Sequence, residues 1–243
     1  MFTIFKKEIR SFFGTPGAYI VSSIFVLICA LFLWFFDNEY NIFNLGTASL
    51  STFFFIAPWA FLFLIPALTM RQLAEEKQMG TLDWLLTQPI KISNLILGKY
   101  LSVLILIAFM LLSTAIFVFS IQYFSMDGKI DTGAIISGYA GLFLLGSLFA
   151  ATGLAVSSFT ENQVIAYVGT VFLCFLMYYG FTGLASYNLL GSLDYYVQQA
   201  GAEFHYNSFL KGIIDTRDLL YFVAVSVLFL CLAYFSLIKL LTR

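Results

Sequence analysis

Long uncharged stretches alternate along the chain with short polar segments. A helix needs about 20 residues to cross the hydrocarbon core of a bilayer, and these stretches are of that length. They contain no Asp, Glu, Lys, Arg or His, and they cover residues 17–36, 52–70, 100–124, 133–158, 164–190 and 219–238. The pattern predicts an all-α integral membrane protein whose six transmembrane helices form one transmembrane domain over residues 1–243. An even number of spans places both termini on the same side of the membrane.

Residues 2–13 precede the first uncharged stretch and show a helical periodicity of their own. Lys6, Lys7 and Arg10 fall on one side, and the other side carries Phe2, Phe5, Ile9, Phe12 and Phe13. We expect an amphipathic helix lying in the membrane interface, followed by a turn at residues 14–17. The alternative is a frayed basic terminus. A cleavable signal peptide is not indicated, because the first apolar run is long enough to span and no small-residue cleavage site follows it.

The polar segment at residues 75–89 joins the second and third predicted spans. Gly80 can interrupt the chain there, and Thr81 is a plausible N-cap for the residues that follow. Asp83, near the start of such a helix, would interact favourably with the helix dipole, and Pro89 would end the helix. The apolar face would consist of Leu82, Leu85 and Leu86. The segment predicts a short helix along the membrane surface; the alternative is an ordinary solvated loop.

The loop before the fifth span contains Thr160, Glu161 and Asn162, followed by Gln163. Thr160 and Gln163 have the spacing of a capping box. The loop is therefore either a cap that opens the fifth helix or a second, smaller contact with a soluble partner.

The longest non-spanning stretch, about residues 185–218, mixes tyrosines with acidic residues and with His205. It is too apolar for a soluble domain and too polar to span, so we expect short helices at the outer face before the last span. Asp215 and Asp218, with Arg217 between them, have a capping-box-like spacing. The alternative is that this rim contacts a substrate or a periplasmic partner.

Basic residues predict the orientation. Nine Lys and Arg residues fall on the side of the termini and three on the other side, so the positive-inside rule places both termini in the cytoplasm. In composition the chain is 61% hydrophobic and 10% charged, with mean hydropathy +0.93. Soluble domains carry about 25% charged residues, so membrane lipid is the solvent for most of this chain. A formal net charge of −1 argues against nucleic acid as a partner.

Residues that could carry catalysis are missing from the pattern. No phosphate-binding loop is present, because neither Gly98-Lys99 nor Gly128-Lys129 has the required upstream glycine or following Ser or Thr. The uncharged spans lower the expectation of an ion-coupled carrier or an intramembrane protease. Three cysteines lie singly in apolar runs and match no metal motif. We expect a chain that is not an enzyme and binds no cofactor.

The run EEKQMGTLDWLLTQPIKISNLILGKYLS resembles the signature of ABC-2 type transporter permeases. In that family the equivalent loop forms a coupling helix that docks on an ATP-binding cassette subunit. The resemblance implies that ATP and Mg are bound by this partner, and that the docking residues are Glu75, Glu76, Gly80, Thr81, Asp83, Leu86 and Pro89. Two departures from the family pattern are Asp83, where Glu is usual, and Gln78, where a basic residue is common.

Three longer runs are similar to the permease subunit of the gliding-motility-associated ABC transporter: FFFIAPWAFLFLIPALTMRQLAEEKQMGTLDWLLTQP, SSFTENQVIAYVGTVFLCFLMYYGF and HYNSFLKGIIDTRDLLYF. The resemblance implies a bacterial inner-membrane protein that pairs with a second permease carrying a large periplasmic domain, or with a second copy of itself. ATP hydrolysis would drive export. The alternative is mechanotransmission, in which the complex acts on a periplasmic machine without moving a substrate.

Overall fold

The computed structural model consists of helices and the turns between them. It describes residues 2–37, 39–45, 49–88, 91–124, 131–187, 191 and 194–241. The helices of the first half are α1 (Phe2–Gly14), α2 (Pro16–Ala30), the π-helical turn η1 (Leu31–Phe35), α3 (Ile42–Leu45), α4 (Ser51–Gln78), α5 (Thr81–Thr87), α6 (Ile92–Ser113) and α7 (Ala115–Phe124). Those of the second half are α8 (Thr132–Phe159), α9 (Gln163–Phe175), η2 (Leu176–Gly180), α10 (Phe181–Ser186), α11 (Asp194–Gln199), α12 (Ala202–Leu210) and α13 (Thr216–Leu241).

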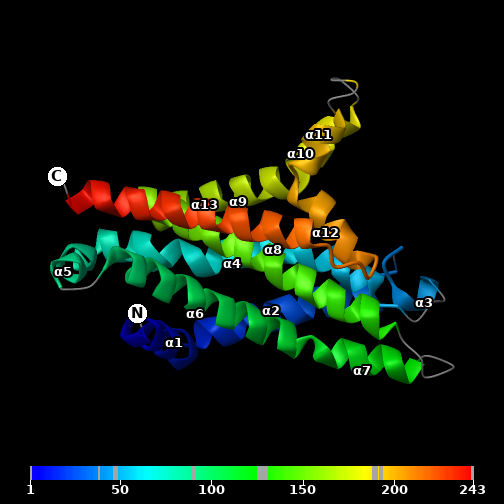
Figure 1. Cartoon of the computed structure of the whole chain (residues 1–243). Helices are drawn as coiled ribbons and strands as arrows, with labels where there is room; N and C mark the ends of the chain where they lie inside the picture. The colour runs from blue at the N-terminus through cyan, green and yellow to red at the C-terminus, as the bar shows by residue number, and fades with distance from the viewer. Residues whose placement is uncertain are drawn as a thin grey trace.

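Six helical segments within the described residues are long and apolar enough to cross a membrane, which confirms the predicted fold class. They are Pro16–Phe35, Ser51–Gln78, Ile92–Tyr123, Thr132–Phe159, Gln163–Ser186 and Thr216–Leu240. The spans lie side by side as a bundle, with α1, α5 and the C-terminus toward one end and α3 and the end of α7 at the other (Figure 1). We call the first of these the α5 end. Two short helices, α11 and α12, precede the last span, as predicted.

Helix α8 occupies the centre of the bundle and packs against α4, α6, α9, α12 and α13. Its glycines allow this close packing. A Cβ on Gly153 would overlap the Thr69 side chain of α4, and a Cβ on Gly138 would lie 2.6 Å from the ring of Phe54. Small residues at such positions let helix backbones approach closely in a membrane, where apolar burial alone drives no association.

Two predicted boundaries are wrong, and both errors concern charged residues. The second span was expected to end near residue 70 and a separate helix to cover 75–89. Instead α4 continues to Gln78, and the short helix is only Thr81–Thr87. The third span begins at Ile92 rather than 100, so it includes Lys99. Three of the charged residues that these longer helices include, Glu76, Lys77 and Lys99, have partners in other helices.

Candidate functional site

The α5 end gathers the turn after α4, helix α5, the α8–α9 loop and α1. Gly80 has φ 68° and ψ 6°, a left-handed conformation that glycine adopts without steric cost. This residue, rather than Thr81, is the N-cap of α5, which corrects the sequence prediction. Thr81 is the first helical residue, and its hydroxyl donates to the Glu76 carbonyl 3.2 Å away. The turn is exposed at Met79, Gly80 and Thr81.

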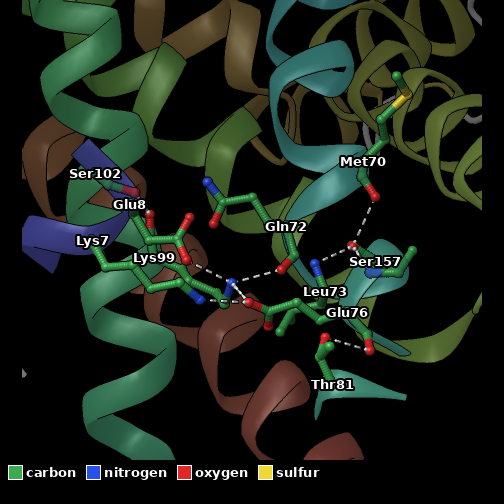
Figure 2. A network of polar contacts seen from close by, with 11 residues as sticks. Lys7, Glu8, Met70, Gln72, Leu73, Glu76, Thr81, Lys99, Ser102 and Ser157 are labelled. Carbon is green, nitrogen blue, oxygen red and sulfur yellow. Dashed lines mark hydrogen bonds and ion pairs between the residues drawn. The ribbon is translucent and has the colours of Figure 1, made fainter. Parts of the chain in front are cut away.

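Lys99 lies at the centre of a polar cluster beneath this turn. Its side chain is 1% exposed and its Nζ donates to the Gln72 carbonyl at 2.7 Å. The same Nζ lies 3.0 Å from Oε1 of Glu8 and 2.9 Å from Oε1 of Glu76. Figure 2 shows Lys99 reaching from α6 between Glu8 of α1 and Glu76 of α4. An ammonium group has three hydrogens to donate, and this geometry offers one acceptor to each.

The charges of this cluster do not balance among the buried groups. One ammonium serves two carboxylates, whose side chains are 12% and 17% exposed. Lys7 is 3.7 Å from Glu76, but its side chain is 62% exposed, and such surface pairs contribute little. Lys99 is therefore the cation that permits two acidic residues to be held against the apolar bundle. The cluster joins α1, α4 and α6 at one point.

Ser157 forms a second junction, between α8 and α4. Its hydroxyl accepts from the backbone N–H groups of Leu73 at 3.2 Å and Ala74 at 2.9 Å, and donates to the Met70 carbonyl at 3.2 Å. Next to it, the Ser158 carbonyl accepts from the Lys77 ammonium and from the Ser236 hydroxyl. The last turns of α4 are thus bonded to α8 as well as to α6.

The α8–α9 loop is ordered by Asn162 rather than by the predicted capping box. Asn162 Oδ1 accepts from the N–H groups of Val164 at 2.8 Å and Ile165 at 3.4 Å, so Asn162 is the N-cap of α9. Thr160 supports it, because its hydroxyl accepts from the Asn162 N–H at 3.1 Å. The predicted Thr160–Gln163 pairing is therefore wrong. An asparagine at this position satisfies two helix-terminal N–H groups by itself.

The two predicted contact segments meet at one hollow. Its volume is about 440 Å³, and it is lined by Gln78, Glu161, Asn162, Gln163 and Val164. Exposed apolar side chains stand beside it, since Met79 is 66% and Val164 is 67% exposed. The sequence pattern did not place these segments together, because Gln78 and Glu161 lie 83 positions apart in the chain.

Of the remaining residues predicted at this end, the structure describes the side chains of some and not of others. Glu75 is partly exposed, whereas Glu76 points into the cluster around Lys99. The side chains of Asp83 and Leu86, and all of Pro89, lie outside the described residues. The role of the whole set in docking stays a prediction.

Four residues of the clusters were not singled out from the sequence as site residues: Glu8, Gln72, Lys99 and Ser157. A signal existed for Glu8, which lies midway between Ile4 and Phe12 at helical spacing. That places it on the side of α1 that faces the bundle. Lys99 also carried a signal, because it is the one charged residue between Lys91 and the end of the third span at Tyr123.

The predicted outer rim forms a separate cluster at the opposite end. His205 Nδ1 is 2.6 Å from Asp218 Oδ1, and Nε2 is 2.9 Å from the Gln199 carbonyl, while the ring stacks on Tyr221 at 4.0 Å. Asp215 accepts from the N–H of Arg217 at 3.0 Å and so caps α13. Asp218 does not complete a capping box, because its carboxylate is engaged by His205.

Helix α12 carries two groups with shifted pKa values close to this rim. Burial raises the pKa of Tyr206 well above its ordinary range; its hydroxyl donates to the Phe54 carbonyl at 2.7 Å. Burial also raises the pKa of Glu203, and the Thr182 hydroxyl opposes this shift. Among the described residues no group of three or more His, Cys, Asp or Glu side chains could hold a metal ion.

Comparison with known proteins gives one result for the whole chain. A family model described as ABC-2 family transporter protein matches residues 2–240. The comparison with curated proteins gives no match.

Proposed function

The chain belongs to the ABC-2 transporter family, and from this premise we propose that its α5 end receives the force of ATP hydrolysis from a separate ATP-binding subunit. Members of the family are membrane-spanning permease subunits of ABC transporters, and the family implies an ATP-binding cassette partner in general. ATP and Mg would be bound by that partner. This chain would supply the docking surface and the moving helices.

The proposed docking surface consists of the exposed turn at Met79–Thr81, the 440 Å³ hollow beside Gln78, and the α8–α9 loop. It combines a concavity with exposed apolar side chains and the acidic Glu161. A partner that inserts a side chain into the hollow would touch α4 and α9 together. We assign Glu76 a different task from the one its sequence motif suggests: it holds the docking turn to the bundle from inside.

The observation that carries the proposal is the attachment of α5 to the spans. Leu82 of α5 is 1% exposed and packs in a cluster with Leu73, Leu95, Leu154 and Leu237. These residues belong to α4, α6, α8 and α13. Because packed interiors transmit displacement instead of absorbing it, a push on α5 would move four spans. The Lys99 and Ser157 junctions would carry the same displacement to α1 and α8.

Docking can be tested by charge changes at exposed positions that lie outside the Lys99 and Ser157 junctions. Gln78→Arg combined with Glu161→Arg should weaken co-purification of the ATP-binding subunit while leaving membrane insertion unchanged. The matched control is Asn207→Arg with Glu39→Arg, which makes the same charge change at two exposed residues of the opposite end. Undiminished co-purification of the first variant, with the partner present in normal amount, would count against this docking surface.

We further propose that the protein lies in a bacterial inner membrane with the α5 end and both termini in the cytoplasm. The support is the excess of Lys and Arg at this end. Reporter fusions at the C-terminus test it: a fluorescent protein that folds in the cytoplasm should be active there, and alkaline phosphatase should be inactive. The reverse result would invert the orientation.

A complete transporter needs a second membrane-spanning half. The resemblance to the gliding-motility-associated system favours a second permease with a large periplasmic domain over a second copy of this chain. Co-expression of this chain alone with its ATPase tests the difference by the mass of the purified complex. A stable complex with two identical membrane subunits would favour the second copy.

Mechanotransmission remains the second candidate function, and the filling of the bundle favours it. Aromatic side chains occupy the interior, including Phe25, Phe61 and Phe149, each 0% exposed. At these positions of the described residues, aromatic rings fill the interior of the subunit. ATPase activity in reconstituted vesicles should then proceed without solute accumulation. Accumulation of a defined solute would refute this alternative and support export.

A further inference from the structure

Helix α1 presents three different faces. Toward the bundle it places Ile4, which is 7% exposed, and Glu8, which pairs with Lys99. Along one flank it carries apolar side chains, with Phe2 78% exposed and Phe13 packed on the ring of Phe109 at 5.4 Å. Away from the bundle it is basic. The expected two-sided amphipathic helix therefore uses its acidic residue internally and leaves its outward face cationic.

The outward face forms a hollow of about 650 Å³. It is lined by Phe2, Thr3, Lys6, Lys7, Arg10 and Ser11. Lys6 and Arg10 are exposed. Three cations and two hydroxyl groups along one helix face are a donor set suited to a phosphate group, since Lys and Arg bind phosphate by charge-assisted hydrogen bonds. Phe2 joins this donor set to the apolar flank.

The chain connection holds α1 at the membrane boundary. The Thr15 hydroxyl donates to the Ser11 carbonyl at 3.1 Å, and Pro16 follows at once as the first residue of α2. Since α2 is itself a candidate span, α1 ends where the first span begins. A bilayer therefore meets α1 at the level of lipid headgroups, with the apolar flank toward the acyl chains.

We propose that the basic hollow of α1 binds the phosphate of an anionic phospholipid headgroup. Charge complementarity and the adjoining apolar flank both favour a lipid over a soluble acidic partner. The bound phosphate would compete with Glu76 for Lys7, whose Nζ is 3.7 Å from that carboxylate. Lipid binding would thereby reach the cluster that joins α1, α4 and α6.

The test compares lipid selectivity of the full-length protein in vesicles of phosphatidylcholine and phosphatidylglycerol. Electron paramagnetic resonance of spin-labelled lipids measures the protein's preference for phosphatidylglycerol over phosphatidylcholine. Lys6→Gln with Arg10→Gln should lower that preference, by at most about five-fold for each basic residue removed. Lys211→Gln with Arg217→Gln is the matched control, with the same charge change at the opposite end. Both variants change exposed residues, and gel filtration verifies that they remain folded.

Four outcomes are decisive. A loss of selectivity in the α1 variant alone, which salt also weakens, supports the proposal. Equal selectivity in wild type and the α1 variant overturns it, and so does unchanged selectivity with impaired binding of the ATP-binding subunit, which would assign the face to a protein. If millimolar inorganic phosphate abolishes the selectivity while chloride at the same ionic strength does not, the hollow prefers free phosphate to a lipid headgroup and the lipid assignment fails.

Discussion

Replacing Lys99 by methionine should destabilise the protein far more than removing either of its acidic partners. Methionine keeps most of the length of the side chain and removes the charge. The two carboxylate oxygens, on Glu8 and Glu76, each lie within 3.0 Å of Nζ, so they are no more than about 6 Å apart. At an effective dielectric constant of about 20, two unit charges at that distance repel by about 3 kcal/mol.

The expected magnitudes differ because the charges are unequal in number. Lys99→Met leaves two carboxylates without their buried cation and should lower the free energy of unfolding by about 3–5 kcal/mol. Glu8→Gln leaves Lys99 paired with Glu76 and keeps an amide oxygen as acceptor, so it should cost about 1–2 kcal/mol, the difference between a charged and a neutral hydrogen bond. Adding Glu8→Gln and Glu76→Gln to Lys99→Met removes the repulsion and should restore at least about 2 kcal/mol.

The protein's own cysteines provide the assay. Cys29 and Cys174 are buried and Cys231 is exposed. In a Cys231→Ala background, a thiol-reactive dye therefore labels the protein as it unfolds. Unfolding by SDS in mixed micelles then gives the free energy for each variant, with Lys211→Met as a control for loss of an exposed charge.

The reasoning is refuted if Lys99→Met costs no more than Glu8→Gln, or if the triple variant is no more stable than Lys99→Met.

Three further predictions concern packing, capping and pH. Gly153→Ala should destabilise by about 1–3 kcal/mol through overlap with Thr69, and Thr69→Gly should recover part of that loss in the same unfolding assay; no recovery would place the strain elsewhere. Asn162→Ala should lower the free energy of unfolding by about 1 kcal/mol, whereas Gln163→Ala should be nearly neutral. Equal destabilisation by the two substitutions would instead support the Thr160–Gln163 capping box. Because burial raises the pKa of Glu203 above 4.5, the folded state holds the proton more tightly than the unfolded state, so this residue's contribution to stability is present at acidic pH and is lost as the pH rises through the raised pKa. Glu203→Gln should flatten that part of the thermal stability profile, and an unchanged profile would contradict the assignment.

Local sequence patterns were sufficient for the helices but not for their ends. The six uncharged windows correspond to the six spans, and residues 2–13 correspond to α1, because periodicity and length are properties of contiguous residues. The end of α4 and the cap of α9 were misplaced. At both places several residues could serve locally. The contacts of Lys77 and Ser157 with distant segments help to order the end of α4, whereas Asn162 caps α9 by contacts within the loop itself.

In the candidate site, too, local motifs could be recognised from the sequence but contacts between distant residues could not. Glu75–Pro89 could be recognised from its motif, but Glu76 could not be recognised as a buried residue. Its partner Lys99 was considered only as part of the Gly98-Lys99 pair and as one of the basic residues that predict the orientation. The third member, Glu8, is 91 residues from Lys99 in sequence, and nothing in the pattern of α1 alone pairs them.

The sequence by itself determined that the chain crosses the membrane as helices. In lipid every backbone polar group must be bonded within its own segment, and a run of about 20 apolar residues can do so only as a helix. Only the tertiary structure decided which charges lie inside. A buried charge is tolerated when its partners converge on it, and those around Lys99 come from α1 and α4, which only folding brings together.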